Sequence, residues 1–248
     1  MKIDYGFDIA EPARRVVTIG SFDGVHLGHR VLLGHLRNMA SRLNAESVVV
    51  TFDPHPRIAM GRAEGMQLLT TVEERARLLA EAGVDRVVVA RFDDKFRAQP
   101  YEEFVRRVLV DRLGMVGMIV GYNHRLGQGS EGNYERLCPV AEECGFELER
   151  VEQHTASGDK ISSTVVRNVI AGGDMRRAEE LLGTGYRVCG VLSDGVLRDI
   201  NKHKMLPPAG SYQCSIARGD VRTKHIATIE NRSIYIPNAE DGEVVLVF

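Results

Sequence analysis

Residues 15–29 read Arg-Val-Val-Thr-Ile-Gly-Ser-Phe-Asp-Gly-Val-His-Leu-Gly-His, and this stretch decides the fold. The β-branched run at 16–19 predicts a short buried strand that ends at Gly20. The apolar periodicity of 27–43 predicts a helix, so the residues between them form the turn from a strand into a helix. In open parallel sheets, ligands bind beyond the carboxyl ends of the strands. The free N–H groups at the start of the helix favour a phosphate at this turn.

The same alternation of strand and helix continues to about Gly183. Thr71 is the expected N-cap of one helix, with Glu74 in the capping-box position. Short buried strands separated by amphipathic helices indicate an α/β fold, which we predict to be a Rossmann-like, five-stranded parallel sheet with helices on both faces. The further strands are expected over 47–52, 85–90, 115–121 and 146–151, and the further helices over 71–82, 101–113, 131–144, 163–171 and 175–182.

Beyond Gly185 the pattern changes to short alternating segments divided by Gly, Pro, Asn and Asp, with no helix. This pattern predicts a small antiparallel β domain. We therefore expect two domains, residues 1–184 and residues 185–248. About 60 residues make a marginal independent domain, so the second domain is expected to lean on the first. Its strands are predicted over 186–192, 211–217, 225–230, 233–236 and 243–247.

Composition excludes several classes of protein. A net charge of −2 over 248 residues gives no basic field that would attract nucleic acid. No segment is apolar and long enough for a signal peptide or a membrane span. The four cysteines form no CxxC pair and no metal-ligand spacing with histidine, which is typical of thiols in a reducing compartment. We predict a cytoplasmic protein with no metal centre and no nucleic-acid or membrane partner; the sequence identifies no protein partner.

Two histidines give the turn after the first strand its chemistry. His26 and His29 are three residues apart, so in the first turn of a helix they point the same way. Two imidazole donors aimed at one point can stabilise the negative charge that builds up on a phosphoryl group in a transition state. The alternative is that they are two polar residues at a solvated helix start.

A second helix start, Ile161-Ser-Ser-Thr-Val-Val-Arg167, offers further donors. Ser162 or Ser163 suits an N-cap, and Thr164 adds a hydroxyl group. Arg167 falls one turn into the helix, where its guanidinium could hold polyphosphate oxygens. A plain helix cap is the alternative. Neither helix start carries a carboxylate-rich metal cage, which suits chemistry in which Mg²⁺ is held mainly by the phosphates of the substrate.

Four motifs, in this order, resemble those of the bacterial bifunctional riboflavin kinase/FMN adenylyltransferase family, whose first domain is an HxGH nucleotidyltransferase. The resemblance covers residues 16–186, so a chance match of all four is excluded. The matching segments are Thr18–His29, Thr51–Pro56 (TFDPHP), Val120–Gly127 and Ile161–Arg167, followed by Leu181-Leu-Gly183.

The resemblance implies that the phosphate of FMN attacks the α-phosphorus of ATP directly, in line, and gives FAD and pyrophosphate with Mg²⁺ accompanying the ATP. It also implies roles for individual residues. For His55 a rigid Pro-His-Pro turn is the alternative, and Asp23 could instead brace its own turn. The implied catalytic residues are His26, His29 and Arg167; the ATP-binding residues are Gly20, Ser21, Phe22, Asp23, Gly28, Ser162, Ser163 and Thr164; the flavin-binding residues are Pro54, His55, Pro56, Asn123, His124 and Arg125.

The sequence departs from the family pattern in two places. In the third motif, Asn123 replaces an aspartate, His124 an aromatic residue and Leu126 a phenylalanine, which weakens the case for flavin as the acceptor. In the second domain, residues 193–205 contain no PTAN segment of the kind that holds ATP and Mg²⁺ in the family's kinase. The resemblance implies a β-barrel-like fold for this domain, and we expect a truncated, degenerate kinase-like tail without riboflavin kinase activity. Transfer to another phosphate acceptor, or a non-catalytic flavin or nucleotide sensor, is the alternative function.

Overall fold

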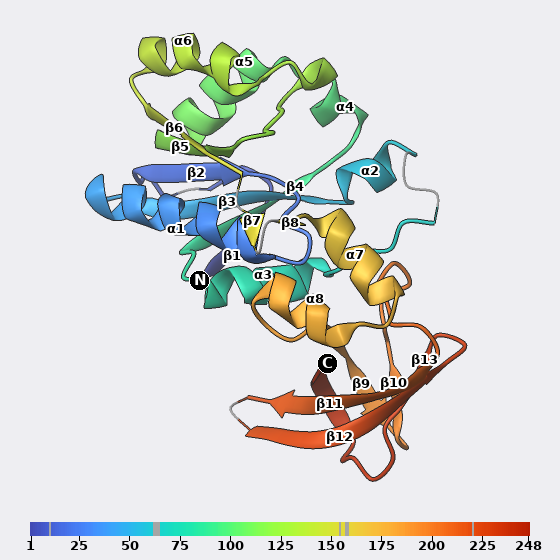
Figure 1. Cartoon of the computed structure of the whole chain (residues 1–248). Helices are drawn as coiled ribbons and strands as arrows, with labels where there is room; N and C mark the ends of the chain where they lie inside the picture. The colour runs from blue at the N-terminus through green and yellow to red at the C-terminus, as the bar shows by residue number, and fades with distance from the viewer. Residues whose placement is uncertain (10, 62–64, 154, 157–158, 220) are drawn as a thin grey trace. The chain divides into compact units, whose positions relative to one another are not determined.

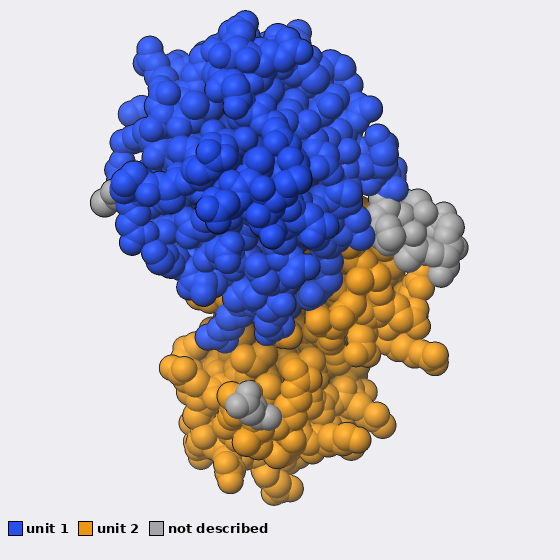
Figure 2. All heavy atoms as spheres, turned by 90° about the vertical axis from the view of Figure 1, so that its left-hand side faces the viewer, with its two compact units in different colours: residues 1–22, 28–65, 76–154 blue, residues 23–27, 66–75, 155–248 orange. Residues whose placement is uncertain are grey.

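The computed structural model describes the chain except residues 10, 62–64, 154, 157–158 and 220. The chain divides into two compact units, coloured separately in Figure 2. Unit 1 comprises residues 1–22, 28–65 and 76–154, and unit 2 comprises residues 23–27, 66–75 and 155–248. The chain therefore passes from unit 1 to unit 2 and back within the turn that follows the first predicted strand.

In the described part of the chain, unit 1 holds a six-stranded parallel sheet in the order β1-β4-β3-β2-β5-β6 (Figure 1). The five strands that the sequence predicts are present. The sixth, β1, was not predicted, because its sequence Lys-Ile-Asp-Tyr lacks an apolar run and it lies at an exposed edge. The strands are β1 (Lys2–Tyr5), β2 (Arg15–Ile19), β3 (Glu46–Asp53), β4 (Arg86–Arg91), β5 (Met115–Gly121) and β6 (Glu147–Val151).

Helices cover both faces of this sheet. On one face, α1 (Leu27–Arg42) packs closely over β5, since a Cβ at Gly117 would lie 2.7 Å from the sulfur of Met39. On the other face, Val17 and Val50 share a core with Phe104 and Leu137 of the covering helices. The other helical segments are α2 (Pro56–Ala59), α3 (Val72–Glu81), α4 (Asp94–Arg97), α5 (Tyr101–Glu103), the π-helix η1 (Phe104–Arg112), η2 (Gln128–Ser130) and α6 (Tyr134–Cys144).

The order of the strands fixes where a ligand can bind. β2 pairs with β3 on one side, reached through α1, and with β5 on the other side. The chain continues from β2 to β3 on one side and from β5 to β6 on the other, so the connections that leave β2 and β5 run in opposite directions. The carboxyl end of β2 is therefore the topological switch point at which such sheets bind ligands. Gly20 follows this end directly, as the sequence predicts.

The described residues of unit 2 include the start of α3, the helices α7 and α8, a two-stranded sheet and a closed antiparallel barrel of order β10-β13-β12-β11-β14-β9. The predicted barrel-like fold is thus confirmed, with β10 as a strand that was not predicted. The elements are β7 (Thr155–Ala156), β8 (Asp159–Lys160), α7 (Ser163–Ala171), α8 (Met175–Leu182), β9 (Arg187–Ser193), β10 (Val196–Arg198), β11 (Gly210–Arg218), β12 (Val221–Glu230), β13 (Ser233–Tyr235) and β14 (Gly242–Val247).

The barrel does not have a core of its own. Val166 and Ile170 of α7 and Leu181 of α8 belong to the same buried cluster as Ile216 and Leu246 of the barrel. The compact unit therefore extends beyond the predicted second domain and includes both helices. The domain boundary at residues 184/185 stays a prediction from the change in sequence pattern.

Candidate active site

The turn after β2 begins in unit 1 with a fixed backbone. The Gly20 N–H donates to the carbonyl of Val50 at 3.0 Å, and the Thr51 hydroxyl donates to the carbonyl of Ser21 at 3.1 Å. Phe22 is buried with a φ of +47°, and its ring centroid lies 5.0 Å from that of His29. The first residues of the turn are thus held against β3, and the His29 ring lies beside an aromatic side chain.

The part of the turn that belongs to unit 2 has a rarely populated backbone. Gly24 has a φ of +84°, and a Cβ there would lie 2.7 Å from Cδ1 of Leu69. Val25, a β-branched residue, has a φ of +41°. For a non-glycine residue such as Val25 this conformation costs about 1–3 kcal/mol and persists only where contacts enforce it. One such contact is the Gly24 N–H, which donates to the Thr70 hydroxyl at 3.1 Å.

The strongest of these contacts are made by Asp23, whose side chain is fully buried. Its carboxylate accepts the backbone N–H groups of Leu69 and Thr70 at 3.1 and 2.8 Å and forms an ion pair with Arg167. Burial alone would raise the pKa of this carboxyl, but Arg167, Arg75 and the two N–H donors outweigh it and hold the pKa below its usual value of 3.8. Asp23 is therefore ionised, and it braces residues far away in the chain as well as its own turn.

The start of α7 is joined to Asp23 at two points. The Ser163 hydroxyl donates to the carbonyl of Asp23 at 2.8 Å, and Arg167 forms the ion pair with the Asp23 carboxylate. Arg167 Nε also donates to the carbonyl of Gln67 at 2.9 Å. Ser162 is the N-cap and accepts the N–H of Val165 at 3.3 Å, as predicted, while Thr164 is exposed. The structure thus places five of the predicted residues, 23, 162, 163, 164 and 167, at one helix start in unit 2.

His26 is buried, with 6% of its surface exposed. Burial lowers the pKa of its imidazole to about 4, and Arg167 lowers it further, although Asp23 and a backbone hydrogen bond oppose the shift. At neutral pH His26 is therefore uncharged and can donate one hydrogen bond. His26 belongs to unit 2, and His29 and Gly28 belong to unit 1, so the joint action of the two histidines stays a prediction.

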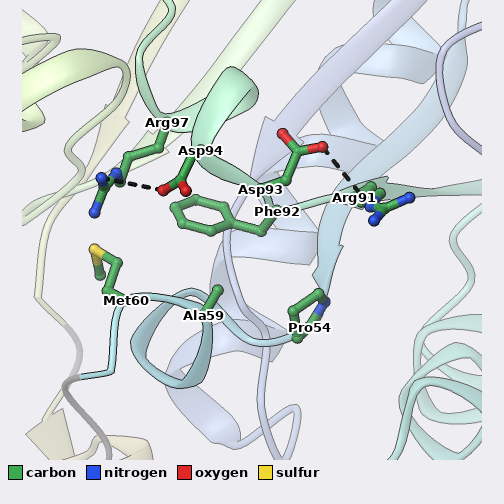
Figure 3. A pocket seen from close by; sticks show the side chains of 8 residues that line it. All are labelled: Pro54, Ala59, Met60, Arg91, Phe92, Asp93, Asp94 and Arg97. Atoms are coloured by element: carbon green, nitrogen blue, oxygen red, sulfur yellow. Dashed lines mark ion pairs between the residues drawn. The ribbon is translucent and has the colours of Figure 1, made fainter.

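At the carboxyl ends of β3 and β4, unit 1 has a cavity of about 290 Å³, shown in Figure 3. Pro54 is the only predicted flavin-binding residue that lines it. His55 is buried and caps α2, since its Nδ1 accepts the Arg57 N–H at 3.2 Å. Pro56 is the first residue of α2. The lining residues are Pro54, Ala59, Met60, Arg91, Phe92, Asp93, Asp94 and Arg97.

Asn123, His124 and Arg125 follow β5 and do not line this cavity. β3 and β5 pair with opposite sides of β2. The carboxyl ends of β3 and β5, which precede residues 54–56 and 123–125, are therefore roughly 10 Å apart across the sheet. Burial and the neighbouring Arg125 lower the pKa of His124 to about 4, whereas Asn123 and Arg125 are exposed. The structure thus brings the two predicted flavin-binding groups to one edge of the sheet but not into one cavity.

Sequence reasoning missed every residue that lines the cavity except Pro54. Most of them lie between the last residue of β4 and the end of α4, namely Arg91, Phe92, Asp93, Asp94 and Arg97. Phe92 packs edge-on against Phe52, with ring centroids 5.4 Å apart. Arg97 and Asp94 form an ion pair at 3.1 Å. The signal was available, because the polar run after β4 follows the carboxyl end of a buried parallel strand, as the turn after β2 does.

The described residues contain no group of three or more His, Cys, Asp or Glu side chains placed to hold a metal ion. Asp23, the carboxylate in the turn after β2, is occupied by Arg167 and by two backbone N–H groups. Among all the described residues, no helix has the length and apolar character needed to cross a membrane.

The turn after β2 carries the His-x-Gly-His sequence, and within unit 2 Asp23 joins this turn to the Ser-Ser-Thr start of α7. The family model of FAD synthetase matches residues 8–165. The chain belongs to the FAD synthetase family.

Relatives with known names agree with this assignment. The FAD synthetase of Listeria monocytogenes is 32% identical over 219 residues, which are 87% of this chain and 86% of the relative. The bifunctional riboflavin kinase/FMN adenylyltransferase of Pseudomonas fluorescens is 34% identical over 258 residues, 99% of this chain and 82% of that protein. The protein of that name in Escherichia coli strain K12 is 37% identical over 180 residues, and the match spans 73% of this chain and 58% of the relative's length.

Among solved structures, one titled as a macrolide-efflux protein from Streptococcus pneumoniae superposes with a TM-score of 0.84. The match covers 100% of this chain and 89% of the other, at 21% sequence identity. At this identity the likeness shows the fold alone.

The buried, neutral His26 predicts how stability depends on pH. Its pKa is about 4 in the folded chain against 6.5 when exposed, so between these values the unfolded chain binds more protons. The contribution of His26 is therefore complete above pH 6.5 and is lost as the pH falls to 4, to a total of about 2–3 kcal/mol. We expect His26→Gln to have a free energy of unfolding that falls less steeply over this range, measured by urea denaturation at several pH values. The control is His203→Gln at an exposed site; equal slopes for His26→Gln and the wild type would contradict the prediction.

Proposed function

We propose that the chain transfers the AMP group of ATP to FMN. An oxygen of the FMN phosphate forms a bond to the α-phosphorus of ATP. The bond from that phosphorus to the oxygen bridging the α- and β-phosphates breaks, and the electron pair leaves with pyrophosphate. The products are FAD and pyrophosphate, and no covalent enzyme intermediate is needed. Membership of the FAD synthetase family supports this reaction.

The observation that carries the proposal is the buried Asp23–Arg167 pair, which joins the His-x-Gly-His turn to the start of α7. In adenylyl transfer there is little bond chemistry for side chains to perform, so rate enhancement comes from positioning and from stabilising charge. Arg167, held by Asp23 and by the carbonyl of Gln67, is kept where its guanidinium can face the β- and γ-phosphates. The N-terminus of α7, with Ser163 and Thr164, supplies further donors.

The two histidines act at the α-phosphate in this proposal. His26 is neutral at pH 7, so it contributes a hydrogen bond and no full positive charge. His29 lies beside the Phe22 ring, which limits the orientations of its imidazole. Donors held in advance at the position where charge develops stabilise the transition state more than the ground state.

Mg²⁺ enters as part of the substrate MgATP. The carboxylate of Asp23 has its oxygens occupied by cationic and N–H partners, which does not suit a resident metal ligand. We therefore assign Mg²⁺ to the substrate phosphates and derive no step through it.

The cavity after β3 and β4 is the proposed site of the flavin ring. Its volume of about 290 Å³ is at the lower end of the range for small-molecule sites. The half-buried ring of Phe92 offers an aromatic surface, and Arg91 and Arg97 offer donors, to a planar heterocycle with carbonyl groups. We propose no riboflavin kinase activity for the barrel, because residues 193–205 lack the family's PTAN segment.

The decisive assay separates the products made from two flavins. Purified protein with MgATP should convert FMN to FAD and should make no FMN from riboflavin, followed by chromatography with fluorescence detection. FAD from FMN supports the transfer, and FMN from riboflavin would refute the absence of kinase activity. Failure to form FAD from FMN would reject the proposed acceptor and direct the search to another phosphate compound.

Removing the ring of Phe92 tests the flavin site. Phe92→Ala should raise the KM for FMN about tenfold, since an aromatic contact of this kind contributes roughly 1–1.5 kcal/mol, and should leave the KM for ATP unchanged. The control is Lys95→Ala in the neighbouring helix α4, because Lys95 does not line the cavity. An unchanged KM for FMN in Phe92→Ala would move the flavin site elsewhere.

A further inference from the structure

A lysine of the barrel is buried and charged in a part of the chain with no assigned activity. Lys204 lies between β10 and β11, and its side chain is 1% exposed. Its ammonium donates to Glu74 at 2.7 Å and to the carbonyl of Leu69 at 2.5 Å, and lies 4.4 Å from the centre of the Tyr186 ring. Burial lowers the pKa of Lys204, and the Glu74 carboxylate opposes this shift. Burying a charged group costs free energy, so the presence of this buried ion pair calls for an explanation other than packing.

One partner of Lys204, Leu69, also holds Asp23, together with its neighbour Thr70. Leu69 donates its N–H to the Asp23 carboxylate and accepts the Lys204 ammonium at its carbonyl, so it is held from both sides. Thr70 donates both its N–H and its hydroxyl to Asp23, at 2.8 and 3.0 Å. Lys204 is therefore one residue removed from the carboxylate that holds Arg167.

Neighbouring backbone bonds make the attachment continuous. The Leu68 N–H donates to the carbonyl of His203 at 2.7 Å, and the Met205 N–H donates to the carbonyl of Leu68 at 2.8 Å. The segment 68–70 thus lies between the barrel loop 203–205 on one side and Asp23 on the other. All of these residues belong to unit 2.

Glu74 connects a second point of the same segment to the barrel. One carboxylate oxygen accepts the Thr71 N–H at 2.9 Å as well as the Lys204 ammonium, and the other accepts the Cys189 N–H of β9 at 2.8 Å. The capping box of α3 is therefore shared with the barrel, and residues 68–74 are fixed at both ends.

We propose that Lys204 is a positioning residue for the nucleotide: by holding the carbonyl of Leu69, it keeps Asp23 and Arg167 in the arrangement that binds the phosphates of ATP. The barrel then serves adenylyl transfer without chemistry of its own. The inference rests on the proposed function in one respect, that ATP binds at Arg167 and the start of α7. A purely structural ion pair is the competing explanation, and it predicts a loss of stability with no specific effect on ATP.

Three variants separate the two explanations. Lys204→Met removes the donor to Leu69 and leaves Glu74 buried without its cation. Glu74→Gln with Lys204→Met removes both charges, and a capping box accepts Gln in place of Glu. Both variants lose the Leu69 contact, but they differ in the buried charge that remains. Ile216→Ala is the control, because it shortens a barrel core residue that is 1% exposed. The side chain of Ile216 has no polar group with which it could hold residues 68–74.

The readout is binding of α,β-methylene-ATP with Mg²⁺ by titration calorimetry, at a temperature at which circular dichroism shows each variant folded. Both Lys204 variants should bind the analogue about tenfold more weakly than the wild type, as expected for the loss of a hydrogen bond to a charged group. Ile216→Ala should bind the analogue with wild-type affinity. If Lys204→Met does not fold, the double variant decides. Wild-type affinity in a folded Lys204 variant, or equal weakening in Ile216→Ala, would overturn the inference.

Formation of FAD from FMN, measured on the wild type in parallel, keeps the two claims apart. A wild type that binds the analogue and makes no FAD, together with weak binding by the Lys204 variants, would reject the proposed acceptor and leave the role of Lys204 standing. A wild type that makes FAD, together with wild-type affinity for the analogue in the Lys204 variants, would support the proposed acceptor and reject the role of Lys204.

Discussion

The buried carboxylate of Asp23 is the contact on which the other parts of the proposed nucleotide site depend. It lies in a turn whose backbone includes Phe22 and Val25 at positive φ, a conformation that needs enforcement. Asp23 provides it by accepting two backbone N–H groups and pairing with Arg167. Removing one partner of such a buried pair costs about 3–5 kcal/mol, because the other charge is left uncompensated. One side chain thus holds the turn, the segment at residues 69–70 and the start of α7 together.

This dependence gives the barrel a structural role that does not require any chemistry of its own. The loop at residues 203–205 pairs with the segment at 68–70, and Lys204 and Glu74 form a buried ion pair beneath it. The barrel also shares its apolar core with α7, the helix that carries Arg167. Loss of a kinase motif would leave these contacts unchanged, whereas loss of the barrel would expose the core side of α7. The compact unit defined by contacts accordingly includes helices that the sequence pattern assigned to the first domain.

Local patterns determined how much of this was predictable. Buried β-branched runs and capping signals predicted β2 to β6 and most helices, because those elements are specified within a few residues; Thr71 and Glu74 form the predicted capping box. The edge strand β1 was missed because pairing with β4, not its own sequence, makes it a strand. The motifs located the helix start around Arg167, but the partners of Asp23 lie 46 to 144 residues away, and no spacing reveals them. His55 caps α2, and its contact with flavin stays a prediction, while the residues that line the cavity, apart from Pro54, fell outside the quoted motifs.

The most direct test of this account is the affinity of Asp23→Asn for α,β-methylene-ATP with Mg²⁺, measured by calorimetry on folded protein. Asparagine preserves the size of the side chain and removes its charge, so Arg167 loses its ion-pair partner while the turn keeps an acceptor for N–H groups. The account predicts binding weakened about tenfold or more, because the guanidinium is no longer held in place. Wild-type affinity in this variant would show that the Asp23–Arg167 pair does not organise the nucleotide site.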